Sequence, residues 1–147
     1  MSAGLARKTI RQRIRDQILT VSGYTESPFH PQSLGRNPKS RGDKKFSIFF
    51  PSTAEAGGRQ KTGEGVKITY PCEVRFLNVV QPHNPITSYE NCLDGEESII
   101  AAIINRTTPL YEKTQIRYES STTGELTDTG EWQLTIINFT INSFFTL

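Results

Sequence analysis

An α+β fold is predicted for this chain by three observations. Two stretches carry apolar residues at helical spacing, four stretches carry apolar residues at strand spacing, and segments rich in proline and glycine separate them. The predicted order is helix, strand, strand, helix, strand, strand. We therefore expect a mainly antiparallel four-stranded sheet with two helices packed on one face and long loops. The length of 147 residues predicts a single domain spanning residues 1–147.

The first predicted element is an amphipathic helix over residues 4–21, followed by Gly23 as its stop. Its basic side chains occupy the faces away from the apolar stripe. The stripe consists of Leu5, Ile10, Ile14, Ile18 and Val21.

Residues 24–45 are predicted to form a long irregular connection, because they hold three prolines and two glycines. The Arg-Gly-Asp sequence at 41–43 is interpreted as a turn within it. A connection of this length is unusual inside a compact domain. We therefore expect it either to be functional or to be ordered only by a partner.

Two strands are predicted around a glycine-rich arm. Residues 46–50 form the first strand, and residues 52–65 form the arm, whose composition is typical of a mobile segment. The second strand runs over 66–76, where apolar and polar residues alternate. Pro71 lies on its polar face and cannot donate a ladder hydrogen bond, so we expect a sheet edge or a bulge there.

A second helix is predicted over residues 88–105, with Ser88 as its cap. Alternatively, Asp94 caps a shorter helix, with Glu97 as its capping-box partner. In that case Glu96 and Glu97 lie in the first turn, where the helix dipole favours them.

The chain is predicted to end in a hairpin: a strand over 115–120, a polar turn over 122–130 and a long strand over 131–144. The apolar residues of the last strand change phase in the middle of the strand. A β-bulge near residues 136 and 137 would keep both halves directed at one core. The first half has Trp132, Leu134 and Ile136, and the second has Ile137, Phe139 and Ile141.

Charge is distributed unevenly along the chain. Residues 1–45 carry ten basic and three acidic side chains, a balance of +7, whereas residues 46–147 carry seven basic and twelve acidic ones, a balance of −5. Such a chain can dock to copies of itself or present its two faces to different partners.

The motifs of catalysis and cofactor binding are not found. Gln60 stands where a phosphate-binding loop needs glycine, and His30 and His83 lie apart in proline-rich loops. Cys72 and Cys92 fall on apolar faces, as is typical of core residues. We therefore predict no catalytic residue, cofactor or metal site, and a protein that is not an enzyme.

A membrane or secreted location is also not predicted. The longest strongly apolar run, residues 99–104, is far shorter than the about 18 residues of a membrane span. The basic N-terminus is not followed by the apolar segment of a secretory signal. With two cysteines only, a reducing cytoplasm is the expected setting.

The sequence resembles the tail terminator (tail-completion) proteins of long-tailed bacteriophages over nearly its whole length. The likeness lies in the basic first helix, Tyr24-Thr-Glu-Ser-Pro-Phe-His-Pro31 and its loop, Lys45-Phe-Ser-Ile48, the glycine-rich arm, the alternating strand to Phe76, Thr87-Ser-Tyr89 leading into Leu93-Asp94, and Gly130-Glu-Trp132.

The resemblance implies a structural virion protein, assembled in the host cytoplasm, that forms a ring at the head-proximal end of the tail tube. Such rings, typically of six copies, end tube polymerisation and join the tail to the head connector. The implied partners are other copies of the chain, the tail tube protein and the head-tail connector or neck protein. DNA would pass through the ring without sequence-specific binding.

The candidate partner-binding residues are the basic side chains of the long loop and of the arm. They are Arg36, Arg41, Lys44, Lys45, Arg59 and Lys61.

Two alternatives remain open at this point. One is a neck or head-completion (head-tail adaptor) protein of the same virion. The other is a small nucleic-acid-binding module that uses the basic first helix and would bind DNA in a strongly salt-dependent way.

Overall fold

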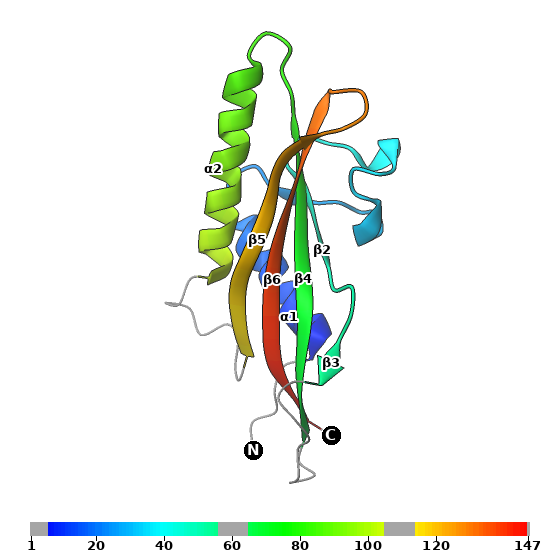
Figure 1. The fold of residues 1–147 in the computed structure, drawn as a ribbon, viewed down its shortest axis with the longest axis vertical. Coiled ribbons are helices and arrows are strands. Elements are labelled where there is room, and N and C mark those ends of the chain that lie inside the picture. The colour runs from blue at the N-terminus through cyan, green and yellow to red at the C-terminus, as the bar shows by residue number, and fades with distance from the viewer. Residues whose placement is uncertain (1–5, 56–64, 105–113, 147) are drawn as a thin grey trace.

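The computed structural model describes residues 6–55, 65–104 and 114–146 (Figure 1). This part of the chain has an α+β fold with two helices and a mixed sheet, which confirms the predicted class. The helices are α1 (Arg7–Leu19) and α2 (Pro85–Ile104); the strands are β1 (Thr25–Glu26), β2 (Lys45–Phe49), β3 (Ala54–Glu55), β4 (Gly65–Val79), β5 (Thr114–Leu126) and β6 (Trp132–Thr146).

The sheet differs in detail from the predicted four antiparallel strands. Its order is β1-β2-β4-β6-β5, and β3 pairs with β4 off this path. The four longer strands pair antiparallel with their neighbours, as expected. The short β1, however, runs parallel to β2 and makes the sheet mixed.

The centre of the sheet is the ladder between β4 and β6, which runs without interruption from Gly65 opposite Thr146 to Val79 opposite Trp132. Because strand side chains alternate between faces, this ladder divides both strands into two sets of residues. One set faces the two helices and the other faces the opposite side of the sheet.

The main core lies between the helices and one face of the sheet, as predicted. Ile10, Ile14 and Ile18 of the expected stripe are buried there together with Ile99 and Ile103 of α2. Val21 is partly buried against this core, and Leu5 lies outside the described residues. The remaining buried members are Tyr24, Phe46, Ile48, Tyr70, Cys72, Val74, Phe76, Cys92, Ile137, Phe139 and Ile141, in addition to Ile10, Ile14 and Ile18.

Helix α2 starts earlier than predicted. Pro85 occupies its beginning, where the fixed φ of proline suits a helix and no backbone N–H is needed. Ser88 is therefore not a cap but lies inside the helix, with its Oγ 2.9 Å from the carbonyl oxygen of Asn84. The alternative start at Asp94 is wrong too, and Glu97 lies well inside the helix rather than in its first turn.

Gly95 does not end helix α2. The glycine at this position leaves the space that the Tyr24 side chain occupies. A Cβ added at Gly95 would lie 1.9 Å from the Tyr24 Oη and 3.1 Å from its Cζ. The Tyr24 ring in turn packs edge-on against Phe76, with ring centroids 5.5 Å apart. Burial raises the pKa of Tyr24 to about 12, so its hydroxyl stays neutral.

The bulge predicted in the last strand is absent from β6, and the expectation for its first half is wrong. Leu134 lies opposite Leu77 on the face away from the helices, as Trp132 and Ile136 do by alternation. Polar residues take the helix side instead. There Thr135 Oγ1 lies 3.0 Å from Cys92 Sγ, and Gln133 donates from Nε2 to the carbonyl oxygen of Ser88 at 2.9 Å.

The irregularities occur in β5, which is longer than predicted. Register shifts fall between Tyr118 and Ser120 and between Thr122 and Glu125. Because a bulge absorbs an extra residue without ending the ladder, Thr122, Glu125 and Leu126 of the predicted turn pair with β6. The turn shrinks to residues 127–131.

On one side of β4, the pairing with neighbouring strands has a gap opposite Pro71. On the side away from β6, β2 pairs only as far as Glu73, and the pairing with β3 resumes at Thr69. The expected sheet edge is therefore a local gap in an otherwise central strand.

The glycine-rich arm is described only at its two ends. Ala54 and Glu55 pair with Thr69 and Ile68. Residues 56–64, which include Arg59 and Lys61, lie outside the described residues.

We predict that Gly95→Ala destabilises the fold by about 1–3 kcal/mol, because overpacking against Tyr24 outweighs the better helix propensity of alanine. In a Tyr24→Phe background the nearest atom is gone, so the same change should cost less. Chemical unfolding of the four chains of this double-mutant cycle measures the difference. Ser98→Ala, at an exposed position of the same helix, is the control; equal costs in both backgrounds would contradict the packing.

Candidate interaction surface

Residues 31–44, which we call the basic platform, lie against the upper part of the sheet, on the face away from the helices (Figure 1). Leu34 and Leu77 are fully buried there, outside the core beneath the helices. A Cβ added at Gly35 would lie 3.4 Å from Leu134 and 3.8 Å from Leu77, so the platform packs directly on the sheet. The phase change in the last strand thus reflects a second small apolar layer.

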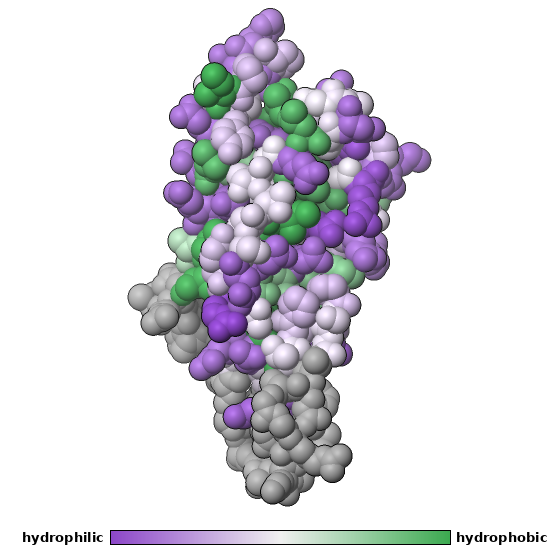
Figure 2. All heavy atoms as spheres, in the orientation of Figure 1, coloured by the Kyte–Doolittle hydropathy of each residue, from purple (hydrophilic) through white to green (hydrophobic). Residues whose placement is uncertain are grey.

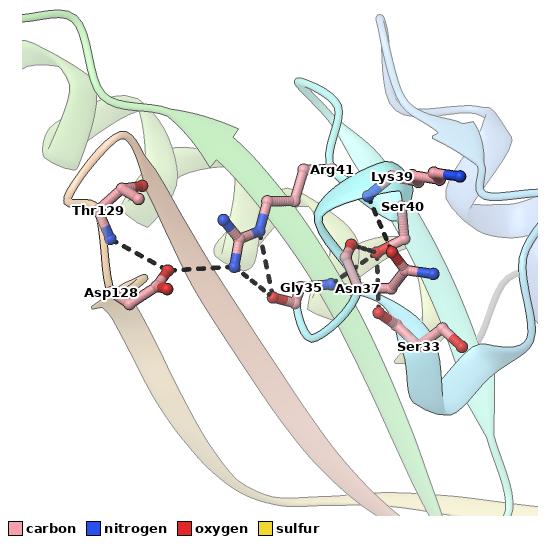
Figure 3. A network of polar contacts seen from close by, with 8 residues as sticks. All are labelled: Ser33, Gly35, Asn37, Lys39, Ser40, Arg41, Asp128 and Thr129. Atoms are coloured by element: carbon pink, nitrogen blue, oxygen red, sulfur yellow. Dashed lines mark hydrogen bonds and ion pairs between the residues drawn. The ribbon is translucent and has the colours of Figure 1, made fainter.

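The platform is held by hydrogen bonds within the chain. Of the two alternatives expected for this connection, ordering by a partner is therefore not required. The buried Ser40 hydroxyl lies 2.8 Å and 2.6 Å from the carbonyl oxygens of Ser33 and Asn37 (Figure 3). It also accepts a hydrogen bond from the Gly35 N–H at 3.2 Å. One side chain therefore ties together the two short 3-10 turns, η1 (Pro31–Ser33) and η2 (Pro38–Ser40).

Arg41 fastens the platform to the β5–β6 turn. Its Nε and Nη2 donate to the Gly35 carbonyl oxygen at 3.3 Å and 3.1 Å, and Nη2 lies 3.3 Å from Asp128 Oδ1 (Figure 3). The Arg41 side chain is only 13% exposed, whereas that of Asp128 is 79% exposed. The ion pair with Asp128 is therefore solvated and stabilises little. The hydrogen bonds from Arg41 to the Gly35 carbonyl oxygen are the main contacts that hold the side chain.

The end of the platform is tied to β4. Asp43 accepts a hydrogen bond from the backbone N–H of Val79 at 3.0 Å, and Lys44 donates its backbone N–H to Leu77 at 2.8 Å. Lys44 has a positive φ of 58°, and its ammonium lies 5.6 Å from the centroid of the Tyr24 ring. The Arg-Gly-Asp sequence is thus an internal turn whose two charged side chains bind within the molecule.

The basic residues predicted to bind partners divide into three groups. Arg36 is exposed, and among the described residues it has no ion pair. Arg41 and Lys44 are engaged within the molecule, and Lys45 is half-buried at the start of β2. The remaining two belong to the part of the arm that is not described.

Sequence reasoning missed Lys39, the second exposed cation of the platform. Asn37 Oδ1 accepts its backbone N–H at 3.0 Å, while its side chain points away from the network (Figure 3). The signal was present, because Asn-Pro-Lys is typical of a capped turn, in which the residue after proline is displayed. Arg36 and Lys39 are therefore the free charges on a rigid loop.

An acidic surface lies on the other side of the sheet and was also missed. Helix α2 has four acidic residues and no basic ones. Glu90, Asp94 and Glu97 are exposed and recur at steps of four and three, which places them on one helical stripe. No ion pair reaches this stripe from the described part of the chain. The fourth acid, Glu96, faces β5 and accepts a hydrogen bond from Thr123.

The basic face of α1 is largely occupied by contacts within the molecule. Arg7 donates to Thr53, Arg11 pairs with Glu26, and Arg15 pairs with Asp16. These contacts leave fewer free cations on α1 than the sequence indicates.

The described residues hold no grouping of three or more histidine, cysteine or acidic side chains that could bind a metal. Cys72 and Cys92 are buried in the core, and burial raises the pKa of both thiols. Within the same part of the chain, neither helix is long and apolar enough to cross a membrane.

Comparison with protein-family models and with curated proteins finds no match for this chain. The two charged surfaces are therefore the features of the described structure that bear on function.

We predict that Ser40→Ala loosens the platform while leaving the helices and the central ladder intact. The partly buried Gly35 N–H loses its acceptor, and we expect a cost near the lower end of the about 1–3 kcal/mol of an unsatisfied buried group. Hydrogen exchange at the Gly35 amide should accelerate relative to amides of β4. Ser22→Ala, at an exposed position, should change neither; unaltered exchange at Gly35 in the Ser40 variant would refute the anchoring role.

Proposed function

We propose that this protein is a structural subunit that assembles with its own copies into a ring at the head-proximal end of a phage tail tube. In this role it ends tube polymerisation and joins the tail to the head connector. The resemblance to tail terminator proteins supplies the place of the ring, and DNA passes through it without sequence-specific contacts.

The observation that best supports self-assembly is the separation of charge within one subunit. The free cations Arg36 and Lys39 lie on one side of the sheet, and the acidic stripe of α2 lies on the other. Charged groups without an internal partner suit contacts with complementary surfaces, which fix orientation more than they add affinity.

A nucleic-acid-binding module is supported less well. Its candidate surface was the basic first helix, and three of its arginines already have partners in the same molecule. Phosphate binding gains affinity from free cations that release counterions, and paired cations contribute less to it. Within the virion, a neck or adaptor role at the same joint is the nearest alternative to the terminator.

We expect the purified protein to cap one end of tail tubes assembled from the tube protein of the same virus. Negative-stain images of tubes with and without the protein would show capped ends and tubes of limited length. Because exposed charges are screened beyond about 8 Å at physiological ionic strength, association should weaken as salt rises. A protein that stays monomeric with tubes present, yet binds duplex DNA tightly at low salt, would favour the nucleic-acid module.

A further inference from the structure

We infer that the basic platform of one subunit docks on the outer face of α2 of a second copy, head to tail. This inference rests on the proposed self-assembly and names the two surfaces that meet. The platform contributes Arg36 and Lys39, and α2 contributes the acidic stripe of Glu90, Asp94 and Glu97.

The two surfaces lie back to back at the same level of one subunit. Gln133 and Leu134 are neighbours in β6 and point to opposite faces. Gln133 donates to the Ser88 carbonyl oxygen at the start of α2, and Leu134 lies beside Gly35 of the platform. Figure 1 shows α2 and the platform on either side of the upper part of the sheet.

Such a placement determines the type of assembly. Two different patches on opposite sides of a subunit cannot form the self-complementary contact of a two-fold dimer. They form a heterologous contact, which leaves one free surface at each end and gives a ring where the rotation between neighbours closes, or an open filament where it does not. A ring is the assembly that the proposed function requires.

The acidic stripe also has apolar residues beside it. Ile86 is 74% exposed, Leu126 is 62% exposed and Tyr89 is 44% exposed. Tyr89 packs on Gly124 of β5, where an added Cβ would lie 2.9 Å from the ring, so helix and strand end share one surface. Figure 2 shows hydrophobic residues among hydrophilic ones along α2 and near the adjoining end of the sheet.

An exposed apolar residue also lies close to the platform in sequence. Phe29, two residues before the platform, is 40% exposed, and the side of the platform is strongly hydrophilic in Figure 2. Apolar residues at the centre with charges around them are the usual anatomy of a protein interface. The hydrogen bonds of Ser40 and Arg41 hold the platform in place before docking, which lowers the entropic cost of association.

The test uses single charge reversals in the full chain, each with a matched control. Asp94→Lys is compared with Asp16→Lys, an exposed aspartate on α1 whose reversal breaks only the solvated pair with Arg15, and Lys39→Glu is compared with Lys67→Glu, an exposed lysine on β4. Sedimentation at low salt should show association weakened about tenfold by each surface variant and little changed by the controls, since facing charges couple strongly across an interface. Circular dichroism and thermal unfolding verify that each variant is folded.

A charge swap then tests whether the two surfaces meet each other. One double variant, Arg36→Glu with Lys39→Glu, inverts the platform, and another, Glu90→Lys with Asp94→Lys, inverts the acidic stripe. The fourfold variant that combines them should recover the association that each double variant loses. Further weakening in the fourfold variant would overturn the inference.

The controls separate this inference from the proposed function. A wild-type protein that assembles while surface variants and controls behave alike overturns the docking surfaces only. A wild-type protein that remains monomeric with and without tail tubes overturns both.

Discussion

The uninterrupted pairing of β4 with β6 is the constraint on which the rest of the structure depends. Fifteen paired positions, from Gly65 and Thr146 to Val79 and Trp132, fix which side chains face the helices and which face away. A shift by one residue would exchange the two sets and expose the core. Because the ladder is regular, the apolar residues Leu77 and Leu134 necessarily emerge on the far side, where a cover is needed. The 31–44 segment provides that cover, so the position of the basic platform follows from the register of the sheet.

The predictable part of the fold is the part governed by periodicity. The steps of four between Ile10, Ile14 and Ile18 place α1, and strict alternation places β4, because burial of one stripe or one face decides both. The last strand was misjudged because one core was assumed. Its polar positions Gln133 and Thr135 could enter the helix side only with partners, and those partners are contributed by α2, 45 and 43 residues away in sequence. Hydrogen bonds between residues so far apart in sequence leave no pattern in the strand itself that would predict them.

The sequence indicates where basic residues lie along the chain, but it does not indicate which of them form contacts within the molecule. Charge along the chain indicated a basic N-terminal region, and Arg36 of that region is exposed, with no ion pair among the described residues. Composition cannot distinguish a displayed cation from one that binds its own chain. Arg41 and Lys44 are of the second kind, held by a carbonyl oxygen and an aromatic ring. The acidic stripe of α2 was missed because Glu96 and Glu97 were interpreted as first-turn residues of a helix beginning at Asp94, the alternative start, which leaves Glu90 outside the helix.

For the proposed assembly, the internal hydrogen bonds that hold the platform matter more than its net charge. A flexible loop carrying Arg36 and Lys39 would lose side-chain and backbone freedom on docking, which opposes the modest gain from exposed ion pairs. Here the Ser40 hydroxyl, the Arg41 fork and the Asp43 contact to Val79 fix the loop within the monomer. The loop therefore loses its conformational entropy on folding rather than on docking. Weak contacts between exposed charges can then direct association in the proposed assembly. Internal hydrogen bonds of neutral groups and shielded charges thus determine whether the exposed charges can act.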